Sequence, residues 1–156
     1  MSGLTHLDER GRARMVDVSA KDVTVRTASA AGLVRCSGAV VDALRGDGVP
    51  KGDALAVARL AGIQAAKRTP DLVPLAHPVA VHAVEVDAVV VDEGVELTAT
   101  VRTADRTGVE MEALTCVAVA GLALVDMVKA LDREAVITDV RVTAKTGGRS
   151  GSWTRG

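Results

Sequence analysis

The chain has 156 residues, of which 25% are charged and 48% are hydrophobic, and this composition is typical of one soluble globular domain with a real core. A formal net charge of -1 argues against a general nucleic-acid or membrane-surface binder, because such proteins usually carry an excess of basic residues. The chain has no phenylalanine or tyrosine and a single tryptophan, so stacking platforms for single-stranded nucleic acid are missing.

The N-terminal segment, residues 1–20, is polar, with scattered glycine, arginine and aspartate. We expect it to be an arm that is mobile unless a partner chain or a ligand holds it. It lacks the apolar core of a signal peptide. The longest apolar run, residues 113–125, is shorter than the roughly 20 residues that cross a bilayer. These features predict a cytoplasmic protein with no membrane partner.

The first half of the domain predicts one strand and two helices. Residues 23–36 are typical of a strand with a turn inside it, and residues 38–44 can form a short helix. Asp53 is a fair N-cap for a helix that runs through about Lys67, and Pro70 is expected to end that helix. The many alanines of this helix permit another element to pack closely against it.

The second half predicts a hairpin, a long helix and a last strand. Alternating polar and apolar residues indicate strands at 79–91 and 95–102, joined by a Glu-Gly turn. Residues 110–131 follow as a helix whose middle is apolar on all sides, so we expect the sheet and another subunit to bury it. Polar and apolar residues alternate again at 135–144, which predicts the last strand.

The resulting order is strand, broken helix, strand, strand, helix, strand. It predicts the α+β class and a ferredoxin-like βαββαβ sandwich, with an antiparallel sheet and helices on one face. We therefore expect a single ferredoxin-like domain at 21–146 between the N-terminal arm and a glycine-rich C-terminal tail at 147–156.

A basic segment and a histidine turn suggest a site for an anionic small molecule. Within residues 51–78, an apolar stretch is surrounded by four cations, Lys51, Arg59, Lys67 and Arg68. The string PLAHP then holds His77 between two prolines, which restrict the backbone. Each lysine alone is more often a solvated surface group, and a lone histidine is more often structural, so the case is collective. His6 and His82 have no such context and are not assigned to the site.

Carboxylates at both ends of the long helix form a second candidate group. Glu110 and Glu112 in its first turn complement the helix dipole, which is also a purely structural role. Asp126 and Lys129 are neighbours on one helix face, either as a surface ion pair or as functional groups beside the apolar stretch. Glu112 and Asp126 fall within about 40° of each other around the axis, so one face carries acid at both ends.

Two further features leave alternatives open. The tail string KTGGRSGS could cradle a phosphate with its backbone amides, or it could simply be flexible. Cys36 and Cys116 lie far apart with no CxxC spacing, so we expect small buried side chains rather than a disulfide or a zinc site, and we assign no metal ligands.

Five motifs in order resemble the molybdenum cofactor biosynthesis protein C family, also called cyclic pyranopterin monophosphate synthase. They are MVDVSAK at 15–21, KGD at 51–53, AGIQAAKRTPDLVPLAHP at 61–78, TGVEMEALT at 107–115 and KTGGRSG at 145–151. The family often has cysteine before the histidine of the turn, where this chain has Ala76, and this departure weakens any thiol role there.

The resemblance implies an enzyme of molybdenum cofactor biosynthesis. Members convert 3′,8-cyclo-7,8-dihydro-GTP to cyclic pyranopterin monophosphate and release pyrophosphate. They have a ferredoxin-like fold and form a homohexamer, a trimer of dimers, with the active site at the dimer interface. No cofactor is certain, and Mg²⁺ remains open as a companion of the triphosphate.

The same motifs imply roles for individual residues. The positions that match the family's catalytic residues are Lys51, Asp126 and Lys129. Those that match its substrate-binding residues are Leu75, Ala76, His77, Met111 and Glu112. The basic positions expected to meet the triphosphate are Arg26, Lys67 and Lys145.

A mechanism follows from these assignments. Opening the imidazole ring of the guanine, closing a pyrazine ring and forming a cyclic phosphate all move protons, so acid and base groups are needed. We expect Lys51, Lys67 and Lys129 to crowd around one pocket, where mutual repulsion favours proton release near neutral pH. One hypothesis is that different subunits supply Lys51 and Lys129. The alternatives are a non-catalytic nucleotide- or pterin-binding module and a purely structural oligomer.

Overall fold

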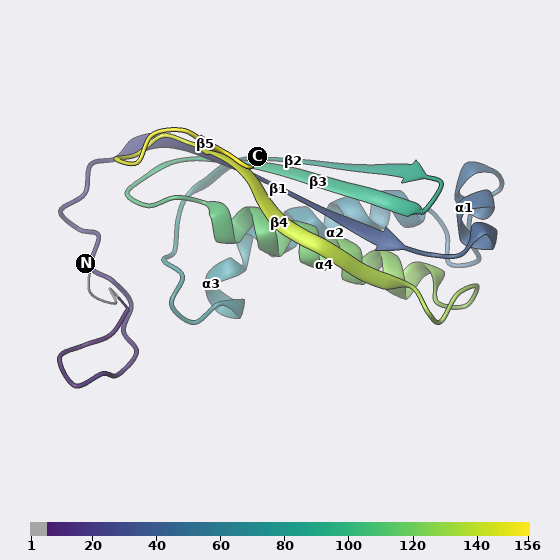
Figure 1. The fold of residues 1–156 in the computed structure, drawn as a ribbon, viewed down its shortest axis with the longest axis horizontal. Coiled ribbons are helices and arrows are strands. Elements are labelled where there is room, and N and C mark those ends of the chain that lie inside the picture. Colours follow the sequence, from purple (N-terminus) through teal and green to yellow (C-terminus); the bar gives the residue numbers. More distant parts are fainter. Residues whose placement is uncertain (1–5) are drawn as a thin grey trace.

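Five antiparallel strands form one sheet, and two long helices cover one face of it (Figure 1). The computed structural model describes residues 6–156. The strands lie in the order β2-β3-β1-β4-β5. Their bounds are β1 Thr24–Arg35, β2 Val81–Val91, β3 Gly94–Asp105, β4 Val136–Thr146 and β5 Trp153–Thr154. Without the two-residue β5, this is the predicted ferredoxin-like α+β fold.

Helix positions follow the predicted caps. The helices within residues 6–156 are α1 Gly38–Arg45, α2 Ala54–Lys67, α3 Thr69–Leu72 and α4 Glu110–Val128. The Asp53 carboxylate accepts a hydrogen bond from the backbone amide of Ala56 at 3.0 Å and thereby caps α2 as expected. As predicted, α2 ends at Lys67, before Pro70, which lies in the first turn of the separate short helix α3.

The predicted turn inside the first strand is wrong, and the reason is close packing. β1 is one continuous strand, paired with β3 along its whole length. Gly32, inside this strand, faces α4, where an added Cβ would lie 2.8 Å from Cγ1 of Val117. The register of β1 with β4 shifts on either side of Ala30 and Ala31, and the extra residues lie on β4, so β1 itself is not interrupted.

The two long helices approach each other closely through small residues. A Cβ at Gly62 of α2 would lie 2.9 Å from the carbonyl oxygen of Cys116 in α4. The core between helices and sheet consists of aliphatic side chains, with Leu97 and Leu124 the largest that are fully buried. Cys116 belongs to this core, and burial raises the pKa of its thiol to about 12, so it behaves as the expected small buried side chain.

Helix α4 is a core helix. By length and composition alone its 19 residues are sufficient to cross a membrane, but half of that apolar window is buried inside the protein. Its buried side is occupied by the sheet and α2, and Leu122 on the other side is 60% exposed. The helix ends at Val128, about three residues before the predicted end.

Strand boundaries differ modestly from the predictions. The hairpin is longer than expected because β3 continues to Asp105, and the last long strand continues to Thr146. In the tail, Trp153 and Thr154 form a further strand that no pattern predicted.

Candidate functional site

Three predicted catalytic residues meet at the C-terminal end of α4. The Nζ atoms of Lys51 and Lys129 lie 3.2 and 2.7 Å from the same oxygen, Oδ1 of Asp126. Hydrogen bonds from Lys129 and then Lys51 lower the pKa of the Asp126 carboxyl, so it is ionised at neutral pH. We call this group the lysine cluster. All three side chains are about half exposed, so they are accessible to a ligand or to another chain.

Two expectations about this cluster are not met within one chain. Lys67 does not join the Lys51 and Lys129 of its own chain, because Lys51 precedes α2 and Lys67 ends it, and 14 helical residues span about 21 Å. Three lysines of one chain therefore do not crowd one pocket. The hypothesis that separate subunits supply Lys51 and Lys129 also loses its basis, because one chain already brings both to Asp126.

The five predicted substrate-binding residues line one pocket at the other end of α4. Its volume is about 420 Å³, and we call it the histidine pocket. The lining residues assigned from the sequence are Leu75, Ala76, His77, Met111 and Glu112. Those that were not assigned are His6, Val16, Val18, Lys21, Thr107, Gly108 and Glu110. His6, which was set aside for want of context, thus reaches the pocket through the fold of the arm.

The N-terminal arm supplies one wall of the histidine pocket. His77 donates a hydrogen bond from Nε2 to the carbonyl oxygen of Val16. Because a carbonyl only accepts, the ring proton is on Nε2 in this arrangement. Earlier in the arm, the carboxylate of Asp8 closes a turn by accepting hydrogen bonds from the backbone amides of Arg10 and Arg12.

Glu112 is a buried acid in the wall of the histidine pocket. Only 3% of its surface is exposed, and burial raises the pKa of its carboxyl from 4.5 to about 7. The neighbouring Glu110 raises the pKa further, while His77 acts in the opposite direction. A substantial fraction of Glu112 is therefore protonated at neutral pH, so it can donate a hydrogen bond as well as accept one. Asp126, in contrast, is exposed and ionised, so the two acids share a helix face but not an environment.

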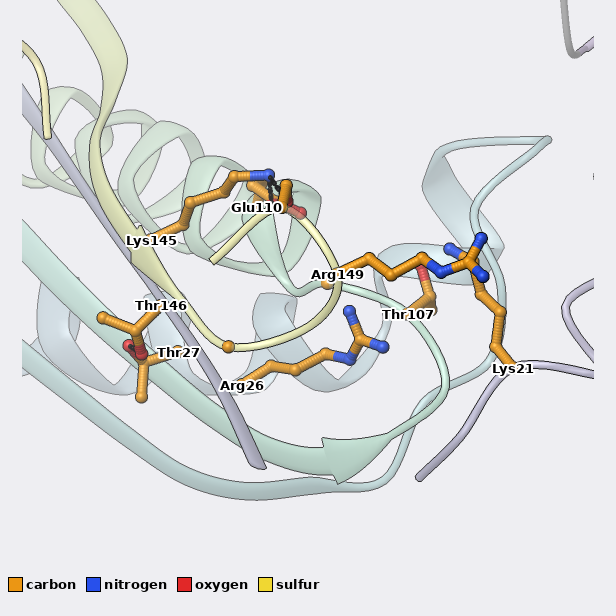
Figure 2. Close-up of a pocket in the computed structure, with 11 residues that line it drawn as sticks. Lys21, Arg26, Thr27, Thr107, Glu110, Lys145, Thr146 and Arg149 are labelled. Carbon is orange, nitrogen blue, oxygen red and sulfur yellow. Dashed lines mark hydrogen bonds and ion pairs between the residues drawn. The ribbon is translucent and has the colours of Figure 1, made fainter. Parts of the chain in front are cut away.

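A second hollow adjoins the histidine pocket, and we call it the cationic pocket (Figure 2). It has a volume of about 280 Å³, and its lining includes four basic side chains, those of Lys21, Arg26, Lys145 and Arg149. Figure 2 shows Arg26 and Arg149 extending toward Lys21, while Lys145 turns to Glu110. Lys21 and Glu110 also line the histidine pocket, so the two hollows are continuous around the start of α4.

Local contacts fix two of these cations. Arg26 donates from Nε to the carbonyl oxygen of Asp105 at 3.1 Å, and Nζ of Lys145 lies 3.6 Å from Glu110. Arg26 and Lys145 were predicted from the sequence, whereas Lys21 and Arg149 were not. Both missed residues lie inside the quoted motifs, at 15–21 and 145–151, so a signal was available. Lys67 lines neither pocket.

The predicted site residues therefore fall into two groups. The lysine cluster lies at the end of α4, and both pockets lie at its start. Glu112 and Asp126 are 14 residues apart on the helix, which corresponds to about 21 Å. Within residues 6–156, no three histidine, cysteine, aspartate or glutamate side chains gather in a way that could hold a metal ion.

Comparison with known proteins agrees with the motifs. Residues 15–148 match the MoaC family. The chain is 69% identical over 152 residues to the cyclic pyranopterin monophosphate synthase of Streptomyces coelicolor, covering 97% of this chain and 89% of the relative. It is 64% identical over 155 residues to that of a Nocardioides species, covering 97% and 95%. It is 59% identical over 152 residues to cyclic pyranopterin monophosphate synthase 2 of Mycobacterium tuberculosis, covering 97% and 91%. On this evidence, the chain belongs to the MoaC family.

Proposed function

We propose that this protein is a cyclic pyranopterin monophosphate synthase, a lyase of molybdenum cofactor biosynthesis that converts 3′,8-cyclo-7,8-dihydro-GTP to cyclic pyranopterin monophosphate and pyrophosphate. One observation carries the proposal: a pocket with a buried acid and a histidine adjoins a pocket lined by four cations. A triphosphate attached to a purine-derived ring system needs both kinds of environment side by side. Membership of the MoaC family supports the same reaction.

The roles divide according to chemistry. The cationic pocket would hold the triphosphate, with the arginines as bidentate partners and the lysines as point charges. In the histidine pocket, Glu112 and His77 would position the ring system and exchange protons with it. The buried, partly protonated Glu112 suits hydrogen bonding to a ring nitrogen or carbonyl.

The lysine cluster would supply general acid and base catalysis. Asp126 is ionised and accepts from both lysines, so its proposed role is to orient them, while Lys51 and Lys129 transfer protons. The chemistry requires water to open the imidazole ring, the pyrazine ring to close, and a ribose-derived hydroxyl to attack the innermost phosphorus. That attack forms the cyclic phosphate and expels pyrophosphate, which needs charge neutralisation by the cationic pocket.

We further propose that each working site combines two copies of the chain. A proton-transfer group must come within about 3 Å of its target. The lysine cluster of one chain lies about 21 Å along α4 from that chain's own histidine pocket, which is too far for such a transfer. The long helices carry exposed apolar side chains, including Leu60 at 62% and Leu122 at 60%, that a second copy would cover. A homohexamer built as a trimer of dimers, as the family resemblance implies, would provide such a partner.

The cellular setting and metal dependence are part of the proposal. A biosynthetic enzyme of this kind would work in the cytoplasm without a nucleic-acid or membrane partner. Mg²⁺ bound to the triphosphate would enter with the substrate, and the chain's own cations would neutralise the remaining phosphate charge.

The competing function is a non-catalytic module that binds a nucleotide or a pterin. It explains the two pockets but not the carboxylate that both lysines share. Purified protein should be incubated with 3′,8-cyclo-7,8-dihydro-GTP while pyrophosphate is measured. Stoichiometric release supports the synthase, whereas tight binding of the intermediate without any release would establish the binding module instead.

A further inference from the structure

The C-terminal tail folds back onto the strand that it leaves. In the pairing of β5 with β4, Trp153 lies opposite Lys145 and Thr154 opposite Ala144. Beyond β5, the Arg155 backbone amide donates to the carbonyl oxygen of Thr143 at 2.8 Å. The Arg155 side chain donates from Nε to the carbonyl oxygen of Val142 at 2.7 Å, and its guanidinium lies 5.5 Å from the centre of the Trp153 ring. Residues 147–151 are thus a loop closed at both ends.

Glycines press this loop against β1. Gly147 and Gly148 have φ angles of 87° and 74°, in the region that favours glycine. A Cβ at Gly147 would lie 2.2 Å from the carbonyl oxygen of Val25, so no other residue fits there without moving the strand. On the far side of the loop, Nζ of Lys145 lies 3.0 Å from Oγ of Ser150.

Arg149 lies in the middle of this closed loop, and its side chain extends into the cationic pocket (Figure 2). Arg26 is held from β1, whereas Arg149 has no strand or helix of its own to hold its backbone. A hydrogen bond from the Gly151 amide to the Gly148 carbonyl oxygen at 3.3 Å closes a turn around it. This turn is joined to the sheet by β4 at one end and by β5 at the other.

We propose that β5 is a positioning element, with Trp153 as its anchor, that holds Arg149 in the cationic pocket before an anionic ligand arrives. The ligand's identity rests on the proposed function, and the anchoring of the tail does not. Without β5 only the glycine contacts with β1 and the Lys145–Ser150 hydrogen bond hold the segment after Thr146, and a ligand must then complete the ordering of the loop and of the arginine side chain when it binds.

The size of the effect follows from the entropy of that ordering. Fixing the backbone of a residue and immobilising a long side chain each oppose binding, so loss of β5 should weaken the affinity for a polyphosphate by about tenfold. Once bound, the ligand orders the loop in the variant as in the wild type, so the occupied site is the same in both proteins. KM for the substrate should therefore rise while kcat stays within about twofold of the wild-type value.

The test uses full-length protein with substitutions, because a truncation would move the C-terminal carboxylate toward the pocket. The variant Trp153→Gly/Arg155→Gln removes the ring and its cation. Trp153→Phe keeps a ring over Arg155 and should restore wild-type affinity. Arg45→Gln is the matched control for loss of one positive charge, since Arg45 pairs with Asp92 on the surface. Arg45 is the last residue of α1, and α1 lies at the opposite end of the sheet from β5 (Figure 1). Titration calorimetry with inorganic pyrophosphate and steady-state kinetics give the two readouts.

The expected result is a tenfold weaker pyrophosphate affinity and a raised KM in the double variant alone. Unchanged affinity and KM in that variant would overturn the proposal. A variant with a lower Tm but a wild-type KM would also overturn it, because β5 would then be merely structural. If the wild-type chain neither binds pyrophosphate nor releases it from the cyclic intermediate, the proposed function fails, and with it the assignment of the ligand.

A measurement on the wild-type protein tests the anchor independently of any variant or ligand. Trp153 is the only tryptophan, and the chain has no tyrosine, so time-resolved fluorescence anisotropy reports this site alone. An anchored β5 predicts that Trp153 rotates with the whole particle. Fast local rotation on the nanosecond timescale, as in a loose tail, would overturn the proposal.

Discussion

Glu112 should make the stability of the protein depend on pH in a defined direction. The fold favours its neutral form, because burial raises the pKa of its carboxyl from 4.5 to about 7. Between these values the folded chain binds more protons than the unfolded chain, so the free energy of unfolding falls as pH rises and levels off above pH 7. Since one pKa unit corresponds to 1.36 kcal/mol, the loss amounts to about 3 kcal/mol between pH 4.5 and pH 8. Glu112 is only 3% exposed, so solvent does little to screen the effect.

The assay is urea unfolding of the wild type and of Glu112→Gln at pH 5 and pH 8. The neutral glutamine keeps the shape of the acid but cannot ionise, so the free energy of unfolding of the variant should rise by about 2 to 3 kcal/mol relative to that of the wild type on going from pH 5 to pH 8. Other titrating groups are common to both proteins and cancel in the comparison. Glu96→Gln, at an exposed position of β3, should show no such gain. The reasoning would be refuted if the difference between Glu112→Gln and wild type were the same at both pH values.

The remaining predictions concern catalysis and helix packing. Lys51→Ala or Lys129→Ala should lower pyrophosphate release by about 100-fold or more without unfolding the chain, as expected for loss of an acid or base group, and near-normal turnover with circular dichroism unchanged would disprove their roles. Gly62→Ala should lower the free energy of unfolding by about 2 kcal/mol, because its Cβ would meet the Cys116 carbonyl oxygen at 2.9 Å. Gly38→Ala, with open space around its Cβ, is the control, and equal urea midpoints for the two variants would argue against the close helix contact.

The fold could be predicted because each element carries a local signal. Alternating polar and apolar residues predicted the hairpin, and Asp53 predicted the start of α2. The order of the elements then allowed only a few topologies. The turn expected inside the first strand shows the limit of such signals, since a small residue needed for packing, such as Gly32 against Val117, looks the same in sequence as one needed for a turn. β5 could not be predicted, because two residues carry no period and the strand exists only where β4 is there to pair with it.

Most residues of the candidate site could be predicted from the sequence, but their arrangement in space could not. The motifs identified His77, Glu112 and the lysine cluster, but distances between motifs depend on how the helices run. Lys67 shows the difference: it follows Lys51 closely in sequence, yet the length of α2 separates them. Lys21 and Arg149 were missed because basic residues in an arm and a tail resemble solvated surface groups until the fold directs them into one pocket.

The central structural claim is that a working site joins the lysine cluster of one copy to the histidine pocket of another. The direct measurement is pyrophosphate release by mixed oligomers, made by refolding Lys51→Ala and His77→Ala chains together in equal amounts and verified by native mass spectrometry. In a symmetric pair, one of the two sites of each mixed dimer regains both wild-type groups, so activity should recover to about a quarter of wild type. Lys51→Ala refolded with Lys129→Ala should recover none, because both lysines meet at Asp126 of the same chain. Recovery in the second mixture and none in the first would contradict the account.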